Sequence, residues 1–178
     1  LAAMLPRIIV RFEKAPEASG NTRKELAALA LEMIKDEPFF GVGINNWGIK
    51  CNPPYAYCER SGRKALRTQD GQQDGVVETV YLLVGAECGL IGLGAMLAWL
   101  LFYYFSCIRL VLRLRGTPYF FVPVGLLGGL TASYLQSCLE WVLRQQMNLI
   151  ILMFMFAIIS YLNTSWRRLR ALDQESAI

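Results

Sequence analysis

Three long apolar stretches dominate the second half of the chain, and a long polar segment precedes them. The apolar stretches cover residues 79–105, 119–139 and 147–165, and the polar segment covers residues 13–78. At about 1.5 Å rise per residue, each apolar stretch is about as long as a helix that crosses a hydrocarbon core of about 30 Å. The pattern therefore predicts three transmembrane helices behind a large polar loop.

Shorter segments complete this plan. Residues 1–12 are apolar but short and basic, so we expect them to be the end of a preceding span in a larger membrane protein. Residues 106–118 and 140–146 connect the spans, and residues 166–178 form a polar tail. The predicted fold class is an all-α integral membrane protein, a multi-span helical bundle.

Residues 22–37 of the polar segment have the periodicity of an amphipathic helix. Its apolar positions are Leu26, Leu29, Ala30, Met33 and Ile34. These positions share one helical stripe. Asn21 or Thr22 can cap the helix, and Pro38 should end it, because the residue before proline disfavours the helical region. We expect the glycine- and phenylalanine-rich turn that follows to lie on the membrane surface.

Charge is distributed unevenly along the chain. Residues 13–78 carry nine Lys or Arg and ten Asp or Glu, so the net charge of +4 comes from elsewhere. The arginines next to the later spans are Arg109, Arg113, Arg115, Arg167, Arg168 and Arg170. The positive-inside rule therefore places residues 106–118 and 166–178 in the cytoplasm, and the large loop on the external face. Because no soluble segment gathers this positive charge, we expect no binding to nucleic acid.

Glycines and acids mark the first predicted span. Gly85 and Gly89 have the G-x-x-x-G spacing that lets another helix approach closely. On a helix they share a face with Glu78, which stands at the membrane edge. Glu87 lies inside the span, roughly on the opposite side. An ionisable residue there is a functional hypothesis by default, and a structural partner on another element is the interpretation that its position favours.

The histidine and cysteine content limits the chemistry. The chain has no histidine, which removes the commonest metal ligand and the commonest general base. None of its five cysteines, and no carboxylate cluster, has the spacing of a zinc site, so we expect no metal and no cofactor. Cys51 and Cys58 lie in the external segment, where a disulfide between them and two free thiols are both open alternatives.

Four charged residues from distant parts of the chain share the predicted external face. They are Arg23, Glu78, Glu140 and Arg144. Acids, arginines and an aromatic turn at the boundary of water and lipid form a candidate active site. Each residue also has a structural alternative, because Arg23 and Glu78 suit an exposed surface and the i, i+4 spacing of Glu140 and Arg144 suits a salt bridge.

Two stretches resemble the O-antigen ligase and polymerase family of bacterial membrane glycosyltransferases. Residues 22–43, TRKELAALALEMIKDEPFFGVG, resemble its Arg-led amphipathic helix that ends in a D-x-P-x-x-G-x-G turn. Residues 78–93, ETVYLLVGAECGLIGL, resemble its loop-to-helix motif, usually H-N-x-Y-L followed by E-x-G-x-x-G. Residues 137–148, SCLEWVLRQQMN, are a looser match. The matches are distributed over residues 22–165.

The resemblance implies a GT-C-like fold in the bacterial inner (cytoplasmic) membrane, with the large loop in the periplasm. It implies a metal-independent enzyme that transfers a glycan from an undecaprenyl-diphosphate donor at the periplasmic face. The acceptor would be a hydroxyl of a lipid, a glycan or a protein. The partners implied are therefore this donor, such an acceptor and membrane lipids.

The resemblance also implies roles for individual residues. Arg23 matches an arginine proposed to meet the donor diphosphate. Glu78 stands where ligases of the family carry the histidine proposed as general base, and Thr79 stands where Asn usually follows it. This departure favours a polymerase or a divergent transferase over a lipid A–core ligase. The further candidates for substrate binding are Arg144, Glu140 and Tyr81.

Two other classes of function remain open. A flippase or transporter for lipid-linked oligosaccharides would bury charges at mid-membrane in broken helices, and Glu87 is the residue that hints at this. A non-catalytic subunit of polysaccharide export would tolerate Glu78→Gln and Arg23→Ala, whereas an enzyme would lose turnover on both.

Overall fold

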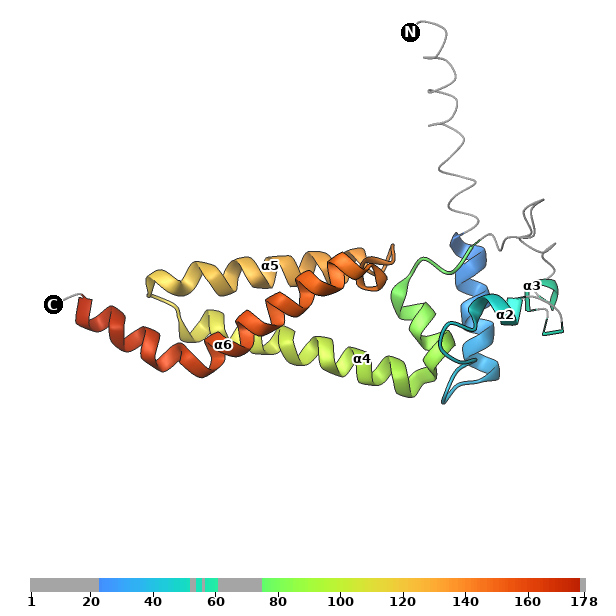
Figure 1. The fold of residues 1–178 in the computed structure, drawn as a ribbon, viewed down its shortest axis with the longest axis horizontal. Helices are drawn as coiled ribbons and strands as arrows, with labels where there is room; N and C mark the ends of the chain where they lie inside the picture. Colours follow the sequence, from blue (N-terminus) through green and yellow to red (C-terminus); the bar gives the residue numbers. More distant parts are fainter. Residues whose placement is uncertain (1–22, 52–53, 56, 61–74, 177–178) are drawn as a thin grey trace, which may run out of the picture. The chain divides into compact units, whose positions relative to one another are not determined.

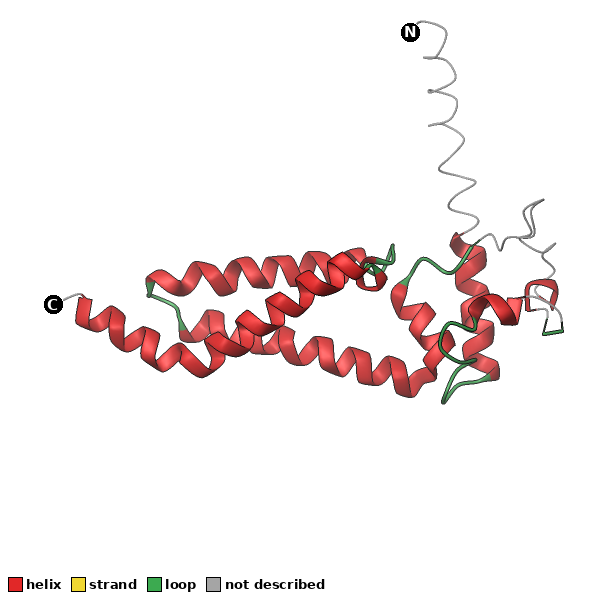
Figure 2. Ribbon diagram, in the orientation of Figure 1, coloured by secondary structure: helices red, strands yellow, loops and turns green. Residues whose placement is uncertain are grey.

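The regular secondary structure of the described part of the chain is helical. The computed structural model describes residues 23–51, 54–55, 57–60 and 75–176, and every regular element within these residues is a helix (Figure 1, Figure 2). The all-α prediction is therefore confirmed for this part. The predictions for residues 1–12, for the cap at residue 21 or 22 and for much of the external loop lie outside it.

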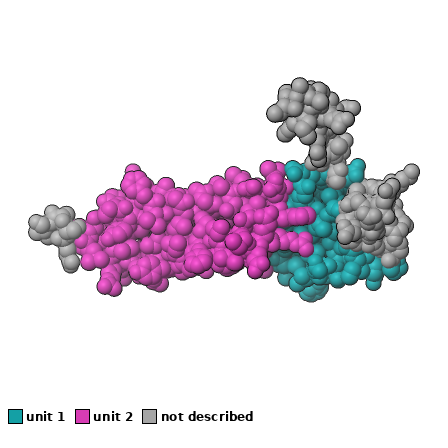
Figure 3. Space-filling model, turned by 45° about the horizontal axis from the view of Figure 1, so that its top comes forward, with its two compact units in different colours: residues 1–92 teal, residues 93–178 magenta. Residues whose placement is uncertain are grey.

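The chain divides into two compact units, residues 1–92 and residues 93–178, which Figure 3 shows in teal and magenta. The elements of unit 1 are a helix over residues 23–36, α2 (Trp47–Cys51), α3 (Tyr57–Arg60) and the start of α4 (Val80–Arg113). Unit 2 contains the rest of α4, η1 (Pro118–Phe120), α5 (Phe121–Gln136), η2 (Val142–Arg144) and α6 (Gln146–Ser176). Each unit has its own packing and is described in turn.

The helix over residues 23–36 confirms the amphipathic prediction and supplies the centre of unit 1. It ends two residues before Pro38, and the N–H of Glu37 closes its last turn on the Met33 carbonyl at 3.0 Å. The residues of its stripe that are at most 2% exposed are Leu26, Leu29, Ala30 and Met33. Full burial of a Leu or Met side chain contributes about 1.5–3 kcal/mol, so this stripe is a main support of the unit.

Side chains from every other element of unit 1 pack against this stripe. The buried partners are Val42, Trp47, Tyr57, Cys58, Val77, Leu83 and Ala86. Val42 comes from the turn after the first helix, and Trp47 is the first residue of α2. Leu83 and Ala86 lie in the first turns of α4, so the beginning of this predicted span is also part of the core of unit 1.

A break at Gly89 interrupts α4. The φ of 69° and ψ of −174° at this residue are outside the helical region. Immediately before the break, the carbonyls of Ala86 and Glu87 accept hydrogen bonds from the N–H groups of Val42, at 2.8 Å, and Gly43, at 2.9 Å. The turn after the first helix therefore supplies donors for carbonyls that an unbroken helix would pair internally.

The same turn also supplies acceptors on the other side of the break. The N–H of Leu90 donates to the carbonyl of Pro38 at 2.7 Å, and the N–H of Ile91 donates to the carbonyl of Phe39 at 3.4 Å. These N–H groups begin the second part of α4 and have no helical carbonyl to bond to. The turn and the break thus form one hydrogen-bonded structure.

This structure corrects the interpretation of Gly89 as part of a seam for another helix. At Gly89 the close neighbour is the backbone of the turn, because a Cβ there would clash with the Phe39 carbonyl. A Cβ at Gly41, which also has a positive φ of 68°, would clash with the backbone of α4. Two glycines therefore allow a backbone-to-backbone contact that no other residue type would fit.

Three helical stretches among the described residues are long and apolar enough to cross a membrane: Val80–Arg113, Pro118–Gln136 and Gln146–Asp173. The chain is a membrane protein on this ground, as predicted. Helical structure continues beyond the predicted span ends at residues 105 and 165, because a helix pairs its backbone internally and does not need to stop at the membrane edge.

In unit 2, α5 contacts the second part of α4 through polar groups. The hydroxyl of Tyr134 donates to the Leu100 carbonyl at 3.0 Å, and the hydroxyls of Tyr104 and Thr131 are hydrogen-bonded at 3.2 Å. Hydroxyl bonds of this kind tie helices together where lipid gives no hydrophobic driving force. They fix the last two turns of α5 against α4.

Helix α6 packs against the second part of α4 through an aromatic stack. The rings of Tyr103 and Phe156 lie 3.9 Å apart with an interplanar angle of 8°. Leu110 of α4, Leu130 of α5 and Ile159 of α6 are fully buried within unit 2. These contacts join α4, α5 and α6 into one small bundle (Figure 1).

The arginine-bearing ends of α4 and α6 lie together. The guanidinium of Arg113 donates to the Asn163 side-chain oxygen at 3.5 Å and lies 5.1 Å from the ring of Trp166. The connection over residues 140–146 lies at the opposite end of unit 2 (Figure 1). The two basic clusters are therefore at one end of the bundle, the arrangement that the positive-inside rule expects.

Candidate functional site

An ion pair joins two of the predicted site residues, although they are far apart in the sequence. The guanidinium Nε of Arg23 contacts the carboxylate Oε2 of Glu78. Arg23 is the first described residue of the helix over residues 23–36, and Glu78 lies two residues before α4 begins. Both side chains remain accessible, with exposed fractions of 46% for Arg23 and 35% for Glu78.

The approach to α4 fixes the position of Glu78. Its neighbour Val77 is only 1% exposed and anchors the segment in the core. The indole N–H of Trp47 donates to the carbonyl of Gly75 at 3.2 Å, which holds the start of the segment. Gly75 has a φ of 104°, a conformation that favours glycine. Because Val77 points into the core, Glu78 is directed toward Arg23 and solvent.

The pair combines a positive group with a proton acceptor on a partly exposed side chain, of which the Oε2 atom that contacts Arg23 is buried. A guanidinium matches phosphate oxygens in bidentate geometry, and a carboxylate can take a proton from a hydroxyl. An exposed ion pair contributes only about 0–1 kcal/mol to folding, so stability alone gives little reason for this arrangement. Tyr81 is half-buried in the first turn of α4, three residues after Glu78.

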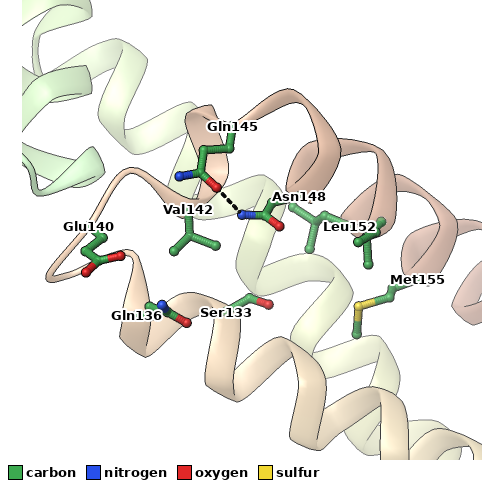
Figure 4. Close-up of a pocket in the computed structure, with 9 residues that line it drawn as sticks. Ser133, Gln136, Glu140, Val142, Gln145, Asn148, Leu152 and Met155 are labelled. Carbon is green, nitrogen blue, oxygen red and sulfur yellow. Dashed lines mark hydrogen bonds between the residues drawn. The ribbon is translucent and has the colours of Figure 1, made fainter. Parts of the chain in front are cut away.

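The other two charged candidates belong to unit 2. Glu140 is exposed in the connection after α5, where it lines a cavity that also contains Gln136 (Figure 4). Arg144 is exposed at the end of η2, and its N–H bonds to the Trp141 carbonyl at 3.0 Å. The grouping of these two residues with the ion pair of unit 1 stays a prediction.

Glu87 has a structural partner, which is the interpretation that the sequence favoured. Its side chain is 7% exposed, and Oε1 accepts a hydrogen bond from the backbone N–H of Trp47 at 3.4 Å. Trp47 begins α2, so the carboxylate supports the start of this short helix. Glu87 therefore connects α4 to α2 within unit 1.

Cys51 and Cys58 are free thiols, and their side chains are hydrogen-bonded to each other. Burial raises the pKa of the Cys51 thiol well above its usual value, and the neighbouring Cys58 raises it further. The hydroxyl of Tyr57 donates to a carboxylate oxygen of Asp36 at 2.9 Å and holds α3 beside the first helix. The disulfide between the two cysteines stays a prediction, and their adjacency is compatible with it.

Within the described residues, no group of three or more His, Cys, Asp or Glu side chains could hold a metal ion. Comparisons of the sequence with known protein families and with curated proteins, and of the fold with solved structures, find no match. The resemblance of residues 22–43 and 78–93 to the ligase and polymerase family therefore rests on the quoted motifs alone.

Sequence reasoning missed two features near these residues. The first is the break at Gly89, for which the only local signal was a glycine inside a predicted span. The second is the cavity beside Glu140. Its signal is readable, because Ser133, Gln136 and Glu140 are polar at i, i+3 and i+7 near the end of an apolar stretch.

Proposed function

We propose that this chain is part of a membrane glycosyltransferase of the O-antigen ligase and polymerase type. The enzyme moves a glycan from an undecaprenyl-diphosphate donor to a hydroxyl acceptor at the periplasmic face of the inner membrane, in the assembly of surface polysaccharide. Arg23 binds the diphosphate, and Glu78 is the general base. The motifs around these residues and their direct contact are the two grounds for this proposal.

The ion pair between Arg23 and Glu78 carries the proposal. Displacement of a diphosphate from an anomeric carbon needs a base near the acceptor and positive charge near the leaving group. The two side chains supply these two requirements next to each other, and both are accessible to a substrate. Their position directly before α4, an apolar helix, suits a donor whose lipid tail lies in the membrane.

The reaction follows from this chemistry. The Glu78 carboxylate takes the proton of the acceptor hydroxyl, and the acceptor oxygen forms a bond to the anomeric carbon of the donor glycan. The bond between that carbon and the diphosphate oxygen breaks, and the diphosphate leaves with the electron pair. Arg23 stabilises the negative charge that develops on it. Binding of the diphosphate draws Arg23 away from Glu78, which frees the carboxylate for the acceptor.

The packing of unit 2 supports the proposed orientation. Arg113 contacts Asn163 and Trp166, so the arginines of α4 and α6 lie at one end of the bundle. Under the positive-inside rule that end is cytoplasmic. The proposed function requires the ion pair to face the other side of the membrane, the periplasm.

A transporter is the second candidate, and the break at Gly89 is the observation that favours it. Secondary transporters bind substrates at discontinuous helices, where unpaired backbone groups face the ligand. In this chain the carbonyls of Ala86 and Glu87 and the N–H groups of Leu90 and Ile91 are all bonded to the turn. A break whose polar groups are paired in this way offers little to a transported substrate, so we favour the transferase.

A complementation experiment tests the proposal in the intact protein. The gene is deleted, the strain receives wild type, Glu78→Gln or Glu37→Gln, and the surface glycan is run on a gel. Loss of a general base typically costs about 10²–10⁴ in rate, so Glu78→Gln should abolish visible glycan polymerisation or ligation. Glu37 is an exposed acid of the same unit, and its variant should restore the wild-type pattern.

A charge-exchanged protein separates a catalytic pair from a structural one. The double variant Arg23→Glu with Glu78→Arg keeps the ion pair but exchanges the positions of base and cation. We expect normal protein levels and no glycan. Restored glycan in this variant, or full rescue by Glu78→Gln, would overturn the catalytic roles and favour a non-catalytic subunit. A normal glycan in the deletion strain would overturn the polysaccharide assignment itself.

A further inference from the structure

Unit 2 contains a polar cavity of about 290 Å³ between α5, the connection after it and α6 (Figure 4). One wall is formed by Ser133 and Gln136 of α5 together with Glu140. Gln145, directly before α6, and Asn148, in the first turn of α6, face this wall. The volume is close to the lower limit of small-molecule sites, which is about 300 Å³.

The first wall has polar groups without a protein partner. Within the described residues, the side chains of Ser133, Gln136 and Glu140 make no hydrogen bond or ion pair to the protein. They offer a hydroxyl, an amide and a carboxylate, which together include donors and acceptors. A ligand in the cavity could therefore bond to them without displacing any intramolecular contact.

The facing wall is already ordered by an amide pair. The side-chain nitrogen of Asn148 donates to the side-chain oxygen of Gln145 at 2.8 Å (Figure 4). This bond leaves the nitrogen of Gln145 as a donor and the oxygen of Asn148 as an acceptor. The two groups are held in place before a ligand binds, which reduces the entropy that binding would cost.

The remaining lining is apolar. Leu152 and Met155 of α6 and Val142 of η2 also line the cavity (Figure 4). Gly129 leaves space for the Met155 side chain, because a Cβ at this glycine would lie 2.9 Å from the Met155 methyl carbon. The cavity thus has an apolar part for the C–H face of a ligand and two walls of hydrogen-bonding groups for its edges.

The charge of the lining restricts the ligand. Among the described residues, Glu140 is the one charged residue of the lining, and no Lys or Arg of this part of the chain takes part in it. A phosphate or diphosphate would meet a carboxylate and no positive group, so it is disfavoured here. Neutral hydroxyl groups, which both donate and accept, match the amides, the hydroxyl and the carboxylate. Sugar rings combine such groups with apolar C–H faces.

We propose that this cavity binds one or two neutral sugar units of a glycan, apart from the diphosphate that Arg23 binds. The choice of a sugar rests on the proposed function, whereas the polarity and charge of the cavity do not depend on it. In the proposed function, unit 1 then recognises the diphosphate and unit 2 recognises the saccharide.

Direct binding to the purified intact protein in lipid nanodiscs tests this inference. The probe is the phosphate-free repeat oligosaccharide, released from the surface polysaccharide of the source cells and detected by saturation-transfer NMR. We expect binding to the wild type, and binding at least tenfold weaker to Gln145→Leu and Gln136→Leu. Gln146→Leu is the matched control, because Gln146 is exposed beside Gln145 but does not line the cavity.

The Glu78→Gln protein separates this inference from the proposed catalysis. It should bind the oligosaccharide as wild type does, because Glu78 is in unit 1. Normal binding by this protein together with normal glycan in its strain would overturn the catalysis and leave the cavity proposal standing. Equal binding by wild type, Gln136→Leu and Gln145→Leu would overturn the cavity proposal. So would binding of phosphoethanolamine in place of the oligosaccharide, since that would make the cavity a lipid-headgroup site.

Discussion

The two parts of α4 differ in the exposure of their apolar side chains. Before the break at Gly89, Leu83 and Ala86 are 3% and 0% exposed, because they belong to the core of unit 1. After it, Leu90 and Ile91 are 51% and 55% exposed. The first part behaves as a helix of a folded domain, whereas the second presents apolar side chains outward, as a helix in lipid does.

This difference changes where the membrane-crossing part of α4 begins. In lipid, every backbone polar group must be paired within the protein, and irregular backbone is tolerated only where protein covers it. The turn over residues 38–43 provides this cover at the break. Exposed apolar residues begin at Leu90, so the part of α4 after the break has a surface suited to lipid, and the turns before the break support the candidate site.

The largest expected effect comes from filling the break. Gly89→Ala places a Cβ against the Phe39 carbonyl and a non-glycine residue at a φ of 69°. Backbone strain of this kind costs about 1–3 kcal/mol, and the clash adds to it, so we expect the loss of about 3 kcal/mol or more of stability. Thermal unfolding of the intact protein in detergent measures the change.

Gly94→Ala is the matched control in the exposed part of the same helix. A Cβ at Gly94 meets nothing within 4 Å, and alanine stabilises a helix interior by about 0.5–1 kcal/mol relative to glycine. Its melting temperature should therefore equal or exceed that of the wild type. If Gly89→Ala were equally well tolerated, the break would be dispensable and the two parts of α4 would not differ in the way described.

The contrast between the two parts also explains what sequence could predict about the fold. The helix over residues 23–36 was predictable, because its apolar stripe and the stop before Pro38 are local properties. The break at Gly89 was not, because its conformation depends on hydrogen bonds to residues 38–43, far away in the sequence. A glycine in an apolar stretch has the same local pattern whether a helix or a turn approaches it.

The candidate site, too, could be predicted from the sequence only in part. The positive-inside rule put Arg23 and Glu78 on one membrane face, but only the folded unit brings their side chains into contact. The polar spacing of Ser133, Gln136 and Glu140 was visible in the sequence. The opposite wall of the cavity comes from α6, and pairing the two walls requires the tertiary packing of unit 2.

An intermediate effect is expected from the buried acid of the first part. Glu87→Leu removes the acceptor for the Trp47 N–H, and a buried donor without a partner costs about 1–3 kcal/mol. Glu87→Gln keeps a side-chain oxygen in this position, so it should lose less than half as much. Urea-dependent unfolding of the same detergent preparations measures both changes.

The exposed acid of unit 2 provides the comparison for Glu87. The side chain of Glu140 makes no hydrogen bond or ion pair to the protein within the described residues, so Glu140→Leu should change the unfolding free energy by no more than about 0.5 kcal/mol. A loss on Glu87→Leu no larger than the loss on Glu140→Leu would contradict a structural role for Glu87. A functional role for Glu87 would then again be the favoured interpretation.

The smallest expected effect concerns thiols in the two units and depends on pH. Burial and Cys58 raise the pKa of Cys51 above its ordinary value of 9.0, so the folded protein keeps this proton when the unfolded chain has lost it. Above about pH 9 the unfolded state binds fewer protons, and stability therefore falls as the pH rises. We expect Cys51→Ala to remove at most about 1 kcal/mol of this loss between pH 9 and pH 10. Cys138→Ala, at an exposed thiol of unit 2, is measured alongside as the control variant. Unfolding curves at the two pH values decide between these outcomes, and an identical slope for wild type and Cys51→Ala would show that burial in unit 1 does not hold the Cys51 proton.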